Sequence, residues 1–387
     1  MLLAHPFRIF FLATAVYAGF VVFAWIAFLF AGWPLPLGWA PLQWHSHEML
    51  YGFVSAAIAG FMLTAMTNWT GARPLQGAGL LALLLVWLAG RVVMWVAAWL
   101  PGWLVSIVDL AFLPVLAIYV SSVLLRHHNR RNFVLVAVLT FLTMGNLTMQ
   151  IGFLSGEIGL LKKGELLGFD LISVLIVIIA GRIIPAFTAN WLRMQGHNAE
   201  AVKTFRWLEI LSLASVVSIL VVDGFNIPGI WIGIAAIFAG SIHALRLAAW
   251  AGLKTRREPL LWILHLAYLW IVIALFLRGA SYFTEAVSPS LWQHAMGVGG
   301  IATLILGVMT RVAVGHTGRP LRLLRFGLLI YLAITAAALL RISVAMEIMN
   351  FHIGVSLSAI AWVVAFSLFM IIYGPILASP RADGKPG

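Results

Sequence analysis

Long runs of apolar residues make up most of the chain, and short polar stretches separate them. A helix that crosses a bilayer needs about 20 mostly apolar residues, and twelve runs reach that length. The pattern predicts an all-α, polytopic membrane helix bundle, with one transmembrane domain over residues 1–387. The predicted spans are 7–31, 44–68, 78–99, 103–125, 132–154, 168–192, 205–223, 228–251, 258–284, 290–313, 322–346 and 352–377.

Composition strengthens this prediction and limits the chemistry. The 387 residues are 63% hydrophobic and only 9% charged, and the mean hydropathy of +1.04 exceeds that of ordinary soluble domains. The first run, from Phe7, is too long for a cleaved signal peptide and is expected to remain as a span. Since there is no cysteine, disulfides and thiolate ligands are excluded, and any metal must be held by His, Met, carboxylate or backbone oxygen.

The net charge of +12 is explained by where the basic residues lie. Sixteen Lys and Arg residues fall on the termini and on alternate loops, whereas the opposite loops hold only Lys162 and Lys163. The positive-inside rule therefore places both termini in the cytoplasm. The basic excess sets the orientation in the lipid bilayer, and nucleic acid is not an expected partner.

Six arginines fall inside or at the ends of predicted spans: Arg91, Arg182, Arg246, Arg278, Arg311 and Arg341. An arginine at bilayer depth costs roughly 2.5 kcal/mol or more unless it is paired or reaches the interface. Arg246 and Arg311 lie near cytoplasmic helix ends, from which a long side chain can reach water. Arg91, Arg278 and Arg341 lie in the outer half of their spans and need partners.

Histidines gather at the same outer level. His45 and His47 begin the second span beside Glu48, His294 begins the tenth and His352 the twelfth, and Asp109 and Asp170 are expected at a similar depth. Imidazoles are common haem ligands, and propionates need positive partners, so haem is a candidate, with His45, His47 and His294 as ligands and Arg91, Arg278 and Arg341 as propionate partners. The alternative for each histidine is an interfacial side chain in contact with water.

The two histidines of the second span cannot share one role. They are two residues apart, about 200° around a helix, so they point in different directions. His47 shares a face with Tyr51, and Glu48 is placed to fix an imidazole tautomer as a supporting residue. One histidine is then expected to face the bundle, while the other orients a group or binds a second centre.

A second set of histidines lies toward the predicted cytoplasmic side. His243 is on the eighth span, His265 is about seven residues inside the ninth, and His316 stands in the loop "RVAVGHTGRPL". A hydrogen-bonded structural role is the simpler expectation for His265, and metal or haem ligation is the alternative. His316 and Arg319 are expected to form a tight basic turn.

A weak internal repeat connects three span ends. "MTNWTGARPL" (66–75) and "MTRVAVGHTGRPL" (309–321) share Met-Thr, Thr-Gly and Arg-Pro-Leu, and "GRIIPAFTANWLR" (181–193) adds a related Thr-Ala-Asn-Trp. These segments are four spans apart, which predicts a pseudo-threefold arrangement of four-helix arcs. Haem-copper oxidases share that layout, but no span here carries an adjacent His-His pair, so oxygen reduction is not expected.

Several of these stretches resemble the NnrS family of bacterial inner-membrane proteins, over about residues 5–375. The resemblance is carried by "WHSHEMLYGF" (44–53), "NWTG" (68–71), "PLLWILHLAYLW" (259–270) and "HAMGVGGIATLILGVMTRVAVGHTGRPL" (294–321). It implies a haem- and copper-containing protein linked to nitric oxide metabolism, denitrification and nitrosative stress. The residues in the matching stretches are His45, His47, Glu48, His265, His294, His316 and Arg319.

The sequence thus leads to three functional hypotheses. The first is a haem b protein, with copper as a further candidate metal, that binds or turns over nitric oxide or a related nitrogen species near the periplasmic face with an unidentified electron donor. The second is a secondary transporter, in which the buried arginines form an anion site. The third is a non-catalytic haem sensor.

Overall fold

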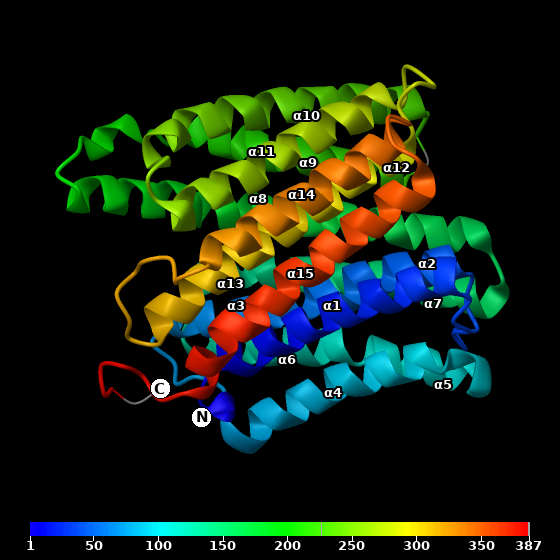
Figure 1. Ribbon diagram of the computed structural model, residues 1–387, viewed down its shortest axis with the longest axis horizontal. Helices are drawn as coiled ribbons and strands as arrows, with labels where there is room; N and C mark the ends of the chain where they lie inside the picture. The colour runs from blue at the N-terminus through cyan, green and yellow to red at the C-terminus, as the bar shows by residue number, and fades with distance from the viewer. Residues whose placement is uncertain (226, 386–387) are drawn as a thin grey trace. The chain divides into compact units, whose positions relative to one another are not determined.

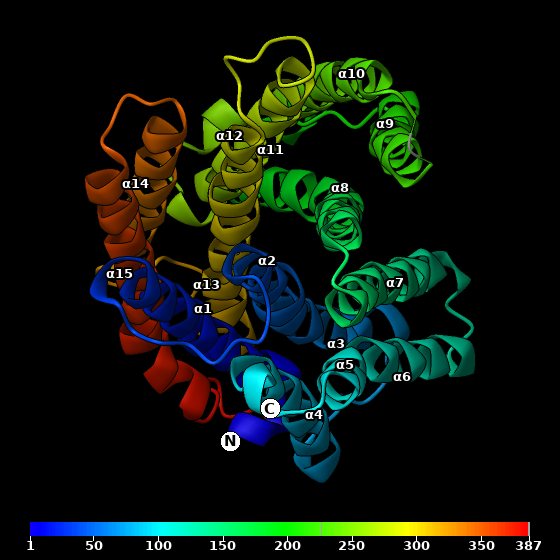
Figure 2. The same ribbon diagram turned by 90° about the vertical axis from the view of Figure 1, so that its right-hand side faces the viewer.

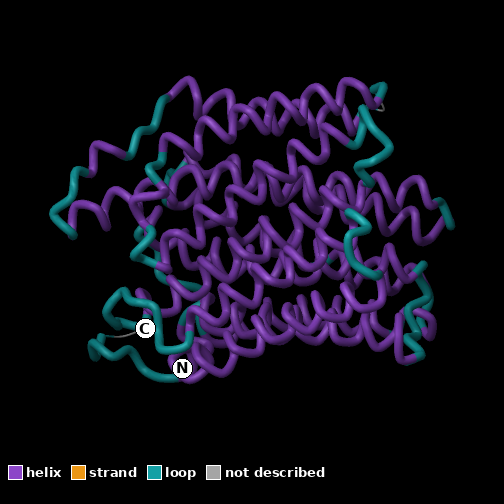
Figure 3. Tube along the Cα trace, turned by 45° about the horizontal axis from the view of Figure 1, so that its top comes forward, coloured by secondary structure: helices purple, strands orange, loops and turns teal. Residues whose placement is uncertain are grey.

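The computed structural model describes residues 1–225 and 227–385. Within this part of the chain the backbone forms helices and loops and no strand (Figure 3). Twelve helices among the described residues are long and apolar enough to cross a membrane, which confirms the predicted all-α multi-pass bundle. Their bounds are Pro6–Ala31, Pro41–Thr70, Gly77–Trp95, Gly102–Arg126, Arg130–Ser155, Ile158–Met194, Arg206–Gly224, Gly229–Ala249, Pro259–Ala280, Pro289–His316, Gly327–Ala345 and Phe351–Ala378.

Proline and glycine mark several of these boundaries. Pro6, Pro41, Pro259 and Pro289 each stand in the first turn of a helix, where the missing N–H costs nothing and the fixed φ suits the helix. Gly71, at φ +72°, ends the second span in the left-handed region, which glycine enters without steric penalty.

The sixth span begins earlier than predicted. It starts at Ile158 rather than 168, so Lys162, Lys163 and Glu165 are helical instead of lying in a loop. The segment contains Leu, Lys and Glu, all good helix formers, and nothing in it stops the helix from extending beyond its apolar run.

The chain divides into two compact units. Unit 1 comprises Met1–Ile172, Val312–Pro320 and Tyr373–Gly387, and unit 2 comprises Ser173–Arg311 and Leu321–Ile372. Residues 226, 386 and 387 lie outside the described part of the chain. The predicted pseudo-threefold order of the spans stays a prediction.

Unit 1 is built around the first two spans. Helix α1 (Pro6–Ala31) packs against α3 (Val54–Thr70), and α4 (Gly77–Trp95), α5 (Gly102–Leu110), α6 (Phe112–Arg126) and α7 (Phe133–Ser155) pack against one another (Figure 2). In unit 2, α9 (Arg206–Gly224), α10 (Gly229–Ala249) and α11 (Pro259–Ala280) run side by side (Figure 1).

Two spans contain a π-helical segment, in which the hydrogen bonds reach one residue further than in an α-helix. In the second span, η2 (Glu48–Phe53) joins α2 (Pro41–His47) to α3. In the tenth, η7 (Ala295–Ala302) joins α12 (Pro289–His294) to α13 (Thr303–His316). Each begins directly after one of the predicted site histidines, His47 or His294, and such segments are frequent at functional sites.

Candidate functional site

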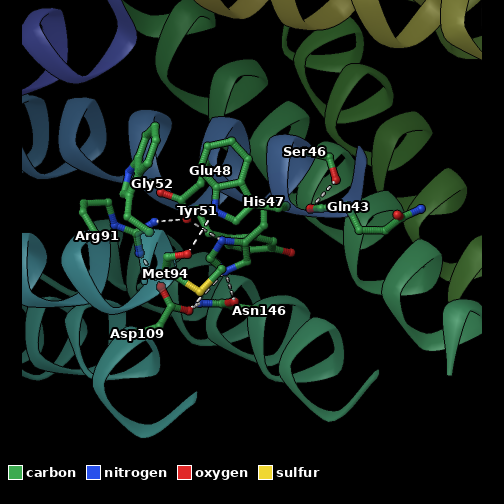
Figure 4. Close-up of polar contacts among 12 residues, drawn as sticks. Gln43, Ser46, His47, Glu48, Tyr51, Gly52, Arg91, Met94, Asp109 and Asn146 are labelled. Carbon is green, nitrogen blue, oxygen red and sulfur yellow. Dashed lines mark hydrogen bonds and ion pairs between the residues drawn. The ribbon is translucent and has the colours of Figure 1, made fainter. Parts of the chain in front are cut away.

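Four buried charged residues form a closed ring in unit 1 (Figure 4). Arg91 of α4 donates to Glu48 Oε1 over 2.5 Å, and it also donates to Asp109 of α5. His47 contacts the same two carboxylates, with Nδ1 2.8 Å from Glu48 Oε1 and Nε2 3.1 Å from Asp109 Oδ2. All four side chains are at most 4% exposed. Each basic group therefore touches both acids, which confirms that Arg91 needs and has partners.

Neutral side chains complete the ring. Asn146 and Gln150 of α7 both donate to Asp109 Oδ2, over 2.9 and 2.7 Å. Tyr17 of α1 donates to Glu48 and itself accepts the Trp95 indole N–H over 3.0 Å. Charge-assisted hydrogen bonds of this kind are stronger than neutral ones and offset part of the cost of burying charge.

Local sequence explains why the ring can close at η2. A Cβ on Gly52 would lie 2.7 Å from Arg91 NH1 and 3.1 Å from Glu48 Oε2, so only glycine leaves space for that ion pair. The Gly52 carbonyl accepts the Trp87 indole N–H over 3.0 Å. The π-helical backbone is thus held in place by a neighbouring helix.

Tyr51 anchors the same segment to α7 and α8 (Ile158–Met194). Its hydroxyl donates to the Gly164 carbonyl over 2.6 Å, in a slot where a Cβ on Gly145 or Gly168 would lie within 2.8 Å of the oxygen. The Tyr51 ring also lies 5.5 Å from the His47 ring, as expected for side chains on one face.

Changing Tyr51 to Phe is expected to lower the free energy of unfolding by about 1 kcal/mol, because the buried Gly164 carbonyl loses its donor. Thermal unfolding in mild detergent measures this change, with half-exposed Tyr119→Phe as the control. Equal melting temperatures for the two variants would argue against an anchoring role.

Unit 2 holds a second buried network and corrects one prediction. Arg246 does not reach the interface as predicted; it is 2% exposed and donates to Glu209 of α9, through Nε over 3.0 Å. Its NH1 donates to the Tyr268 hydroxyl over 2.9 Å, and that hydroxyl lies 2.6 Å from His243 Nδ1. The acidic partner on the preceding span makes burial less costly than extension to water.

Arg278 and Arg311, also in unit 2, have different surroundings. Arg278 is paired with Asp223 and lies 4.5 Å from the centre of the Trp292 ring. Arg311 lies 4.2 Å from the centre of the Phe187 ring, a cation–π contact. Arg278, which the sequence places inside a span, therefore has the acidic partner that a buried arginine needs.

His294 is held in one tautomer. Its Nδ1 lies 2.8 Å from the Ser290 carbonyl oxygen, which can only accept, so Nδ1 carries the proton and the lone pair is on Nε2. Arg341 donates to the hydroxyl of the same Ser290 over 3.4 Å. A histidine fixed in this way by a backbone carbonyl is the usual form of a metal ligand.

His265 is also fixed in one tautomer. The Thr188 hydroxyl donates to the Ile184 carbonyl and lies 2.9 Å from His265 Nε2, which therefore donates to it. The remaining Nδ1 is buried without a hydrogen-bond partner and faces Gly252, where a Cβ would lie 2.7 Å away. The imidazole therefore packs closely against Gly252, where any larger residue would displace it.

The remaining predicted residues have other contacts. The His45 ring stacks on Trp25 at 4.7 Å, with 11° between the ring planes. His352 is exposed, as expected of an interfacial side chain.

His316 ends α13 rather than standing in a loop as predicted, because the helix continues to the residue before Thr317 and Gly318. The turn that follows, with Arg319, receives the C-terminal tail. Arg381 donates to the His316 carbonyl over 3.0 Å, and the Ala382 N–H donates to the Thr317 carbonyl over 2.9 Å. Asp383 lies against Gly318, and the Arg381 guanidinium lowers the pKa of its carboxyl to about 2. The motif therefore has a structural role as a docking turn.

The sequence prediction missed most of the neutral and acidic partners. Asn146 and Gln150 are four residues apart on one face of an otherwise apolar span, a signal that could have revealed them. Tyr17, Glu209 and Tyr268 gave no such signal, because single Tyr or Glu residues near span ends are common.

These features define the class as a multi-pass, all-helical membrane protein whose interior holds ion-paired arginines and histidines. Within that class, the chain belongs to the NnrS family, since the family model, described as "NnrS protein", matches residues 1–381. Comparison with curated proteins gives no match.

The family resemblance implies haem and copper, and the candidate histidines differ in how well they suit a metal ligand. Within residues 1–225 and 227–385, no group of three or more His, Asp or Glu side chains could hold a metal ion. His294 has its ring proton on Nδ1, which is the tautomer of a histidine that binds haem iron through Nε2, and His265 keeps a buried Nδ1 without a hydrogen-bond partner. His47 does not fit a metal ligand, because both imidazole nitrogens already contact oxygen atoms of Glu48, Asp109 and Asn146.

Proposed function

We propose that this NnrS-family protein is a haem b protein of the bacterial inner membrane, with both termini cytoplasmic, that binds or turns over nitric oxide or a related nitrogen species. The family assignment supports a role in nitric oxide metabolism and nitrosative stress. The observation that carries the haem assignment is the Nδ1–H bond from His294 to the Ser290 carbonyl.

In this proposal His294 holds the iron and Arg341 binds a propionate. Among the described residues Arg341 forms no salt bridge, and its hydrogen bond goes to Ser290, four residues before His294. A bound haem would supply an iron to which nitric oxide can bind. Nitric oxide is small, neutral and lipid-soluble, so it can reach a site inside the bundle without a polar channel.

His265 is the residue that we assign to copper. Its Nδ1 is buried without a hydrogen-bond partner, and imidazole is a good ligand for copper. Metal analysis of wild type and His265→Ala tests this role, which predicts copper in the first and none in the second.

The transporter hypothesis is less well supported by the same contacts. Arg91 is neutralised by two carboxylates and Arg278 by Asp223, so two of the three arginines offered for an anion site already have acidic partners. Only Arg341 remains for that role.

Replacing His294 with Ala is expected to abolish or sharply reduce haem content, because the iron loses its ligand. A reduced-minus-oxidised spectrum of protein purified from haem-replete cells measures this, and the wild-type bands should shift when nitric oxide is added. The matched control is His352→Ala, which removes an exposed imidazole and should leave the spectrum unchanged.

Two results would overturn the proposal. A colourless wild-type protein would exclude haem and favour a transporter with Arg341 in its site. Full haem content in His294→Ala would move the ligand elsewhere. If the haem bands shift on addition of nitric oxide but the protein does not consume it, the protein would instead be a sensor.

A further inference from the structure

The oxygen atoms around His47 form an enclosure for a positive charge. Glu48 Oε1, Asp109 Oδ2 and Asn146 Oδ1 lie 2.8, 3.1 and 2.9 Å from its ring nitrogens. They come from η2, α5 and α7, and the three side chains are at most 2% exposed. We call these three residues, with their oxygens directed at His47, the oxygen cage.

Hydrogen-bond directions fix the proton on Nε2. Asn146 uses its amide N–H to donate to Asp109, so the oxygen that faces His47 is the amide carbonyl. A carbonyl oxygen only accepts, and therefore Nε2 of His47 must donate.

The partner of Nδ1 is a carboxyl oxygen of Glu48, and other side chains donate to that carboxyl group. Trp95 donates to the Tyr17 hydroxyl, so that hydroxyl directs its own hydrogen to Glu48. Arg91 donates to the other Glu48 oxygen. Nδ1 of His47 and Oε1 of Glu48 share one proton across 2.8 Å; when that proton is on Nδ1, Glu48 is a carboxylate and His47 is a cation.

Charge counting gives the valence of the group in the cage. Without His47, the side chains are one cation, Arg91, and two anions, Glu48 and Asp109. The other neighbours, Tyr17, Asn146, Gln150 and Tyr51, are neutral. The buried cluster is therefore short of one positive charge, and a net charge in the membrane interior is costly.

We propose that the oxygen cage is a site for one monovalent cation, and that in this structure the cation is the protonated side chain of His47. Oxygen ligands suit a hard cation, and the charge count excludes a divalent one. This inference does not depend on haem, because it concerns only residues of unit 1.

Chemical rescue tests the site directly. His47→Ala empties the cage, and its melting temperature in detergent should rise by several degrees when imidazole is added, because a protonated imidazole restores the missing charge. Pyrazole, which has the same shape but is neutral at pH 6, should give no comparable rise. Wild type should respond to neither compound, which controls for binding elsewhere.

Charge removal provides a second, ligand-free test. In His47→Ala/Asp109→Asn the charges of Arg91 and Glu48 balance without a cation in the cage, so this variant should melt at a higher temperature than His47→Ala alone. If His47→Ala does not fold, recovery of folded protein by Asp109→Asn gives the same information.

The proposal fails if imidazole and pyrazole stabilise His47→Ala equally, since the site then responds to filled volume rather than to charge. It also fails if Asp109→Asn lowers stability further in the His47→Ala background. Spectra of the same samples keep the two proposals separate, because loss of haem binding would leave the rescue unchanged.

Discussion

Arg91→Met is expected to destabilise the protein by roughly 3–5 kcal/mol, the cost of removing one partner from a buried ion pair. The variant leaves Glu48 and Asp109 with His47 as their single cation, inside a cluster that is at most 4% exposed. Thermal or denaturant unfolding in mild detergent measures the loss. The aliphatic replacement keeps most of the side-chain volume, so the effect isolates charge.

Arg126→Met is the matched control, because Arg126 is exposed at the end of α6 and its removal should change stability by less than about 0.5 kcal/mol. A comparable small change in Arg91→Met would show that the ring contributes little. Arg91→Met/Glu48→Gln, in which charge balance is restored, should regain part of the lost stability.

Gly181→Ala is expected to destabilise unit 2 by roughly 3 kcal/mol or more. A Cβ at this position would lie 1.8 Å from Arg246 NH2, so the guanidinium must move. Moving it breaks its bonds to Glu209, Tyr268 and the Val177 carbonyl and leaves a buried ion pair broken.

The control for this change lies in the same helix. A Cβ on Gly159 would meet nothing within 4 Å, so Gly159→Ala should be neutral or stabilising by up to about 1 kcal/mol through helix propensity. Measured melting temperatures of the two variants decide the matter. A Gly181→Ala protein as stable as wild type would mean that Arg246 adjusts without loss.

The fold was predictable because crossing a membrane imposes a strong length and composition requirement on each helix. Within the described residues all twelve spans were found from apolar runs; the largest difference is the start of the sixth, at Ile158 rather than 168, and the eleventh begins at Gly327 rather than 322. The need of Arg91 for partners was also predictable, since an unpaired arginine inside a span is costly.

The identity of the partners was harder to predict. Asp109 was placed at the right depth, but which helices meet is decided by packing that leaves no periodic signal. Arg246 was misjudged because its distance from the helix end suggested water, while Glu209 on the neighbouring helix provides a nearer partner. For His47, the contacts of both ring nitrogens appear only when four helical segments come together.

The π-helical segment η2 limits the length of the second span. A π-helical segment holds one residue more than the α-helical turns that it replaces, so if η2 closed as an α-helix with its sequence unchanged, α2 would rotate by about 100° relative to α3. If Tyr51 stayed in its glycine slot, His47 would point away from Asp109. If His47 kept its contact with Asp109, Tyr51 would leave the slot. The extra residue of η2 therefore lets His47 and the side chains of α3 keep their directions together, and the site depends on a residue count as well as on residue types.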